Sequence, residues 1–238
     1  MIRKILTVVV LTTTLLSLNS CDTLNTAGNT SQNSNVALNT VQSVLNNGTQ
    51  EAFSVFGDSN EFMTNALIDA AMPQKLKDIN NKLESLGLSS VVAKEKALIS
   101  DIANASITTA RPIVTKAINE MTTQDAIAII SGGKDAATSY LKDKTYNDLT
   151  TAIAPVVTDK TESLGINSLL NNALGGNNSS LNGVLGAVLG TGSTASGSEQ
   201  LNDAVTKQLV DGLFNIVEQT ENNVRSNPST ILNSVLSN

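Results

Sequence analysis

Residues 122–140 read TTQDAIAIISGGKDAATSY, which contains the start of one helix, its end and the start of the next. Thr122, followed three residues later by Asp125, resembles a capping box in which aspartate replaces the usual glutamate. Apolar residues follow at helical spacing, namely Ala126, Ile127, Ile129 and Ile130. The pair Gly132-Gly133 ends this helix, and Asp135 can cap a second one. The stretch therefore predicts two consecutive helices.

The same signals recur on both sides of this stretch. Apolar stripes and glycine stops predict helices over residues 38–57, 76–86, 90–109, 136–144, 145–164, 201–225 and 231–236. Residues 58–74 are expected to be irregular. Pro112 is expected to kink or split its helix and Pro155 to bend its own, because proline removes a helical hydrogen bond. The predicted fold class is all-α, an irregular helical bundle with a long loop rich in Asn, Gly and Ser.

The first 20 residues resemble a bacterial lipoprotein signal peptide. Two basic residues, Arg3 and Lys4, precede an apolar run over 5–18, and Cys21 is the single cysteine of the chain. The alternative is an uncleaved membrane anchor, but this run of about fourteen residues is shorter than the roughly 20 that span a bilayer. We therefore predict that Cys21 carries a diacylglycerol and becomes the first residue of the mature chain.

The sequence divides into four parts. Residues 1–20 are the predicted signal peptide, and residues 21–35 are rich in Thr, Asn and Ser and are expected to form a flexible tether. Residues 36–238 form the predicted helical domain. Within it, residues 171–199 are rich in Asn, Gly and Ser and are expected to be a flexible insertion.

The composition excludes several classes of function. Removal of the signal peptide leaves 13 basic and 21 acidic residues, a net charge of −8, which repels nucleic acid and anionic lipid headgroups. The chain has no histidine, so Ser-His and Cys-His triads and imidazole zinc sites are impossible. We predict no metal and no cofactor. The predicted partner is the membrane, bound through the Cys21 lipid on the periplasmic side, and we favour the outer over the inner membrane.

Four stretches of the chain resemble an uncharacterised bacterial lipoprotein family, domain of unknown function 4197. They are residues 62–68 leading to Pro73, residues 125–140, residues 210–214 and residues 221–228. The order and spacing agree over about residues 36–238. The chain departs from the family at Ala66, where proline is usual, and in the insertion at 171–199. The resemblance implies a helical, secreted or lipid-anchored domain and no established activity.

The Gly132-Gly133-Lys134 stretch is not a phosphate-binding loop. Ala128 stands where that loop requires glycine, and Asp135 stands where it requires Ser or Thr. Asp135, Thr138 and Tyr140 can instead line a polar groove that contacts a ligand or partner. The structural alternative is that Asp135 caps its helix and Tyr140 packs its ring at the edge of the core.

Acidic residues of the last long helix are the other candidates. Asp211 lies among apolar neighbours, so we expect it to be partly buried and paired with Arg225 or Lys207. Both Asp211 and Arg225 are candidate contacts for a ligand or partner. Glu218 and Glu221 share a helix face, which we expect to be solvated rather than a general acid–base pair.

The sequence leaves three functions open. The first is non-enzymatic binding or scaffolding by a lipid-anchored envelope protein, with another envelope protein as the partner. The second is binding of an apolar ligand or lipid, with apolar residues 181–189 as a cover. The third is a hydrolase that uses Asp or Glu without histidine. A cavity lined by leucine and valine favours the second function, and buried carboxylates clustered in one cleft favour the third.

Overall fold

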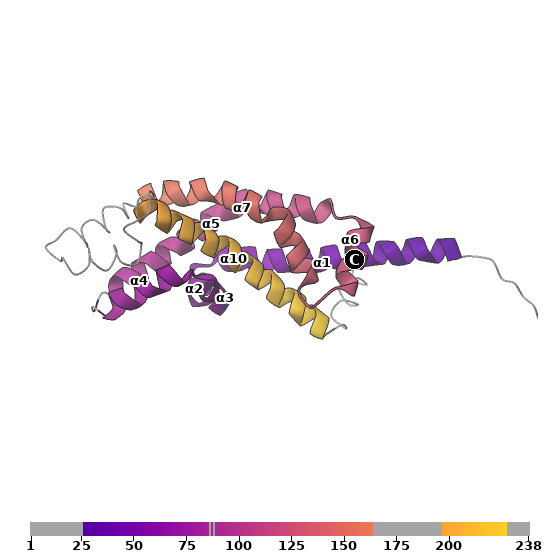
Figure 1. Cartoon of the computed structure of the whole chain (residues 1–238), viewed down its shortest axis with the longest axis horizontal. Coiled ribbons are helices and arrows are strands. Elements are labelled where there is room, and N and C mark those ends of the chain that lie inside the picture. The colour runs from indigo at the N-terminus through magenta and orange to yellow at the C-terminus, as the bar shows by residue number, and fades with distance from the viewer. Residues whose placement is uncertain (1–25, 86, 88, 164–196, 228–238) are drawn as a thin grey trace, which may run out of the picture.

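The computed structural model describes residues 26–85, 87, 89–163 and 197–227. These residues form eight helices and no strand, which confirms the predicted all-α class (Figure 1). The helices are α1 (Thr26–Gly57), α2 (Ser59–Thr64), α3 (Ala66–Ala71), α4 (Gln74–Ser85), α5 (Ser89–Asn119), α6 (Thr123–Ser131), α7 (Ala136–Ser163) and α10 (Gly197–Ser226).

The four long helices surround the core as a ring. Helix α1 packs against α10 and α5, and α7 packs against the same two helices from the other side. The short helices lie outside this ring: α2 contacts α1 and α5, α3 contacts α10, α4 contacts α5, and α6 contacts α1 and α7. The largest fully buried apolar side chains are Leu45, Val55, Phe56, Ile99, Ile102, Ile118, Leu141, Leu149, Ile153, Leu209 and Leu213. The predicted irregular bundle is therefore a four-helix core with short helices added around it.

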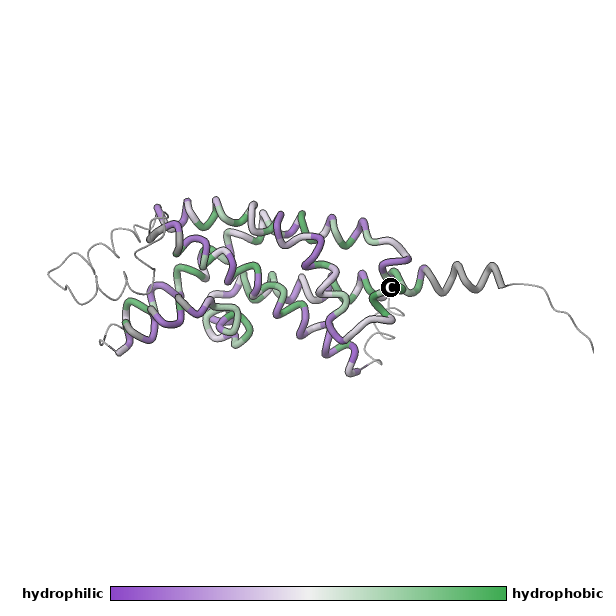
Figure 2. Tube along the Cα trace, in the orientation of Figure 1, coloured by the Kyte–Doolittle hydropathy of each residue, from purple (hydrophilic) through white to green (hydrophobic). Residues whose placement is uncertain are grey.

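Most of the predicted apolar stripes face this core. On α1 and α10 the pattern marks ten residues. Leu38 and Leu201 are partly buried, and the other eight are buried: Val41, Leu45, Ala52, Phe56, Val205, Leu209, Phe214 and Val217. On α5 the pattern marks Val92, Leu98, Ile102 and Ala105 as buried. Val92 and Ile102 are buried, Leu98 and Ala105 are only partly so, and Ile99 and Ala103 are buried as well. Along each long helix apolar and polar residues alternate (Figure 2).

Two glycines allow α10 to approach its neighbours closely. A Cβ atom on Gly48 of α1 would lie 3.2 Å from the Cα atom of Val217 on α10. A Cβ atom on Gly212 would lie 2.7 Å from the Cδ1 atom of Ile68 on α3. Both distances are shorter than ordinary van der Waals contact, so the glycines set how closely α10 packs against α1 and α3.

The expectation that residues 58–74 are irregular is wrong, because two short helices form there. The Asp58 side chain accepts hydrogen bonds from the backbone N–H groups of Asn60 and Glu61, each at 2.9 Å, and so caps α2. The Asn65 side chain accepts from Leu67 N–H at 2.9 Å and caps α3. Satisfied caps stabilise helices that are too short to form by propensity alone.

Neither internal proline splits its helix. Pro112 lies inside α5 and Pro155 inside α7. Both prolines are exposed, as are Thr108 and Thr151, whose carbonyl groups lose their helical partner. Water can therefore satisfy these carbonyl groups, which limits the cost of the missing hydrogen bond.

The predicted boundary between two helices at 144–145 is also wrong, because α7 is continuous from Ala136 to Ser163. Thr145, which we expected to start the second helix, is buried, and its hydroxyl donates to the Leu141 carbonyl oxygen at 2.7 Å. A threonine that bonds back to its own helix in this way does not cap a new one.

Two further boundaries differ from the prediction. Helix α1 begins at Thr26, inside the expected tether at 21–35, and its first turns project beyond the rest of the bundle (Figure 1). The polar residues there cost only tenths of a kcal/mol each in a helix, and α1 runs without a break from these turns into the part that packs in the core. Of the expected insertion at 171–199, residues 197–199 belong to α10. The remainder, including 181–189, lies outside the described residues, as does the helix expected at 231–236.

Candidate functional site

The end of α10 meets the start of α7 through a buried carboxylate. Glu221 is only 1% exposed. Its Oε1 atom accepts from the backbone N–H of Ala137 at 2.9 Å, and its Oε2 atom accepts from the N–H and the hydroxyl of Thr138, each at 2.8 Å. The Arg225 Nε atom donates to Oε1 at 2.8 Å. The carboxylate thus receives hydrogen bonds from three residues on two helices.

Arg225 extends this junction to a third helix. Its Nη2 atom donates to the carbonyl oxygen of Ile129, near the end of α6, at 3.0 Å. The first N–H groups and the last C=O groups of a helix have no partner inside it, and they favour negative and positive charge respectively. Glu221 therefore caps the start of α7 while Arg225 caps the end of α6.

Two sequence interpretations are corrected by this junction. We expected Asp135 to cap α7, but the carboxylate that binds its first N–H groups belongs to Glu221, 84 residues further along the chain than Ala137. We also expected Glu221 to lie on a solvated face with Glu218. Glu218 is partly exposed, whereas Glu221 is buried because α7 supplies the donors that an ionised carboxylate needs.

Asp211 is paired, but with a partner that we did not predict. Its Oδ1 atom lies 3.1 Å from the Nζ atom of Lys142 on α7. The two partners that we expected are engaged elsewhere: Lys207 with Asp203 at 2.7 Å, and Arg225 with Glu221. The Lys142 and Asp211 side chains are 45% and 34% exposed, so this pair lies at the surface and contributes little to stability.

A groove of about 530 Å³ lies between α5 and α7 and is bounded at one end by the start of α6. Its lining residues come from α5, α6, α7 and the segment between α5 and α6. They are Pro112, Ile113, Lys116 and Ala117 from α5, Glu120 and Thr122 from the segment between α5 and α6, Asp125 from α6, and Tyr140, Lys144, Thr145 and Asp148 from α7. Of the predicted site residues, Tyr140 lines this groove. Thr138 and Arg225 lie in the buried junction, Asp135 is partly exposed between α6 and α7, and Asp211 lies on α10.

Two polar groups of the groove, Asp125 and Tyr140, have pKa values shifted away from neutrality. The Asp125 Oδ2 atom accepts from the N–H and the hydroxyl of Thr122, at 2.9 and 2.6 Å, and these bonds lower the pKa of Asp125. They also confirm the predicted capping box. The Tyr140 hydroxyl lies 3.5 Å from the same oxygen, and burial, together with the negative charge of Asp125, raises the pKa of Tyr140. Near neutral pH, Asp125 is therefore ionised and Tyr140 protonated.

Such a groove can bind a ligand better than it can transfer protons. A general acid or base needs a pKa near the working pH, and the shifts of Asp125 and Tyr140 move each group further from neutrality. The other two acids of the groove, Glu120 and Asp148, are exposed at its rim. Apolar side chains from α5 and the Tyr140 ring supply contact area, and charges of both signs surround it.

Neither a metal site nor a membrane span is found within residues 26–85, 87, 89–163 and 197–227. These residues contain no group of three or more His, Cys, Asp or Glu side chains that could hold a metal ion. In the same part of the chain, no helix combines the length and the apolar character needed to cross a bilayer. Cys21, the predicted lipid attachment residue, lies outside the described residues.

The chain forms an all-α domain. Two of the sequence stretches that carry the family resemblance, residues 125–140 and 221–228, meet in its buried Glu221–Arg225 junction. Residues 125–140 form α6 and the start of α7, and residues 221–228 include the carboxylate and the arginine that join them. The chain belongs to the family described as Protein of unknown function (DUF4197), whose model matches residues 31–238. The resemblance predicted from the sequence is thus confirmed. A search of curated proteins and of solved structures gave no match.

Proposed function

We propose that this protein is a lipid-anchored cell-envelope protein that acts by non-enzymatic binding, with the α5–α7 groove as its binding surface. The observation that carries the proposal is a groove of about 530 Å³ in which the pKa values of Asp125 and Tyr140 are shifted away from neutrality. The family-specific stretch at 125–140 supplies two of its lining residues, Asp125 and Tyr140. The N-terminal signal with Cys21 supports the anchor and the periplasm-facing location, for which we favour the outer membrane.

The two alternative functions have less support. An apolar-ligand binder needs a large apolar cavity. The void lined by Phe62, Ile68, Met72 and Ile99, among others, measures only about 20 Å³, which holds a single water molecule. A carboxylate hydrolase needs buried carboxylates clustered in one cleft. The acids of the groove, Glu120, Asp125 and Asp148, are exposed or partly exposed, and buried Glu221 is fully engaged in the junction with α7.

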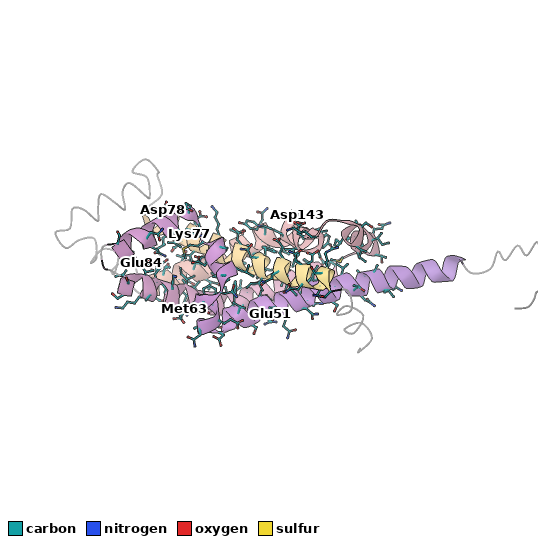
Figure 3. All side chains as sticks on the ribbon, turned by 90° about the horizontal axis from the view of Figure 1, so that it is seen from below. Glu51, Met63, Lys77, Asp78, Glu84 and Asp143 are labelled. Carbon is teal, nitrogen blue, oxygen red and sulfur yellow. The ribbon has the colours of Figure 1, made fainter. Side chains whose placement is uncertain are left out.

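A site-specific cross-linking experiment tests the groove. We expect a photoreactive amino acid at Lys116, on the rim of the groove, to trap an envelope partner in intact cells. The same residue at Asp143, which is exposed on α7 outside the groove, is the matched control (Figure 3). Filling the groove with Ala117→Trp should abolish the product formed at position 116. Equal products at both positions, or a product that survives Ala117→Trp, would reject the groove as the binding surface.

The lipid anchor is tested by Cys21→Ser. We expect this variant to leave the membrane fraction, because two acyl chains on Cys21 give stable anchoring and the acidic mature chain offers no basic surface to replace them. The measurement is fractionation of cell envelopes followed by a salt wash. A variant that still sediments with membranes after the wash would show that another contact anchors the protein.

A further inference from the structure

Three buried oxygen atoms lack partners where α4 packs on α5. They are both carboxylate oxygens of Glu95, on α5, and the amide oxygen of Asn80, on α4; none has a hydrogen-bond partner among the described residues. Buried polar atoms without partners are rare in native proteins, and each calls for a physical explanation. The Asn80 amide lies close enough to Glu95 to lower its pKa, so the three oxygen atoms belong to one polar cluster.

The three atoms are all acceptors when Glu95 is ionised. A proton on Glu95 converts one carboxylate oxygen into a hydrogen-bond donor. The amide oxygen of Asn80 can accept that hydrogen bond. An ionised carboxylate in this place would instead be buried with only the Asn80 amide and the Lys96 charge to stabilise it. The packing of α4 on α5 therefore favours neutral Glu95. Accordingly, burial raises the pKa of Glu95 from 4.5 to about 7, and the Asn80 amide and the Lys96 charge offset only part of the rise.

Apart from Lys96, the described charges around this cluster do not act on Glu95. On α4, Lys77 reaches the Ala70 carbonyl oxygen at 3.5 Å, and Asp78 accepts from Gln74 at 2.7 Å. Lys77, Asp78 and Glu84 lie together at the α4 end of the molecule (Figure 3). On α5, Lys94 is exposed.

Lys96, also on α5, is the charged group that acts on Glu95. It lines the 20 Å³ void together with Asp69 of α3, which is exposed.

Among the described helices, α4 has the smallest interface with the rest of the bundle. It packs mainly against α5 and lies outside the ring of long helices. It follows Pro73 and is succeeded by Gly87, whose φ of +76° favours glycine. The buried residues on α4 include Leu76 and Asn80. A change of charge at this small interface therefore acts on a helix that few other contacts hold.

We propose that Glu95 and Asn80 form a proton-controlled latch, which holds α4 on α5 while Glu95 is neutral and releases α4 when Glu95 is ionised. The sign follows from the two states of the acid. Its pKa is about 7 when α4 is docked and near the ordinary 4.5 when α4 is released. Docking is thus strongest below about pH 4.5, weakens as the pH rises and levels off above about pH 7. Over that window the docking equilibrium constant falls by up to about 300-fold.

A fluorescence titration tests the latch. The natural chain has no tryptophan, so Leu83→Trp, at a partly buried position on α4, supplies the only indole signal. In the full-length protein we expect its emission to shift toward that of a solvated indole between about pH 4.5 and about pH 7. Adding Glu95→Gln should abolish the shift, because the amide cannot ionise and can still donate to Asn80.

A second reporter separates the latch from general unfolding. Tyr146→Trp replaces a ring on α7 that stacks on Phe214 at 6.3 Å between centroids, away from α4. Its emission should stay constant over the same pH range. No shift at position 83, a shift that persists in Glu95→Gln, or an equal shift at position 146 would each overturn the proposal.

Discussion

Replacing Glu221 with alanine is expected to lower the free energy of unfolding by about 3–5 kcal/mol. The substitution leaves the N–H groups of Ala137 and Thr138 without an acceptor at the start of α7, and it removes the counter-ion of Arg225. Urea denaturation followed by circular dichroism measures the change. The matched control is Glu218→Ala on the same helix, where the side chain is partly exposed and we expect a change within about 0.5 kcal/mol.

Coupling between the two ends of the junction gives a second measurement. Arg225 and Glu221 bond to each other and to different helices, so their substitutions should not be additive. The double variant Glu221→Ala/Arg225→Ala is expected to cost less than the sum of the two single variants. An additive result, or a loss below about 1 kcal/mol for Glu221→Ala, would show that the junction does not hold the three helix ends together.

Leu213→Ala should have the second large effect, a loss of about 2–5 kcal/mol. Leu213 is fully buried on α10, the helix that contacts α1, α7 and α3, so a cavity there lies at the centre of the bundle. Two residues earlier, Asp211→Ala should cost less than about 1 kcal/mol, because its pair with Lys142 is exposed to solvent. Urea unfolding of both variants measures the two losses in the free energy of unfolding. A larger loss for Asp211→Ala than for Leu213→Ala would reverse our assignment of surface and core.

Features that depend on residues close together in the chain could be predicted from the sequence. The Thr122–Asp125 capping box, the glycine stop after α6 and the apolar stripes of α1 and α10 all depend on the helix that contains them. Periodicity alone cannot predict which apolar residues are covered by another helix and which remain exposed. On α6 it marks four residues, but Ile127 and Ile130 are 47% and 48% exposed while Ala126 and Ile129 are buried.

Features that need a contact between distant residues were not readable. The burial of Glu221 depends on the N–H groups of α7, and the partner of Asp211 comes from α7 rather than from its own helix. The groove was anticipated only through Tyr140, since its other lining residues become neighbours when α5 and α7 pack together. Glu95 carried no signal in the sequence, because a charged residue near the start of a helix usually faces solvent.

The contact between α1 and α10 has a consequence for how the chain is made. These are the first and last of the described helices, and Gly48 and Val217 bring their backbones close together. The ring of long helices therefore cannot close until the ribosome has synthesised nearly the whole chain. Contacts between distant parts of a sequence also form slowly. With the signal peptide that we propose, we expect the nascent chain to remain loosely packed for that interval and to reach the translocation machinery before the ring closes.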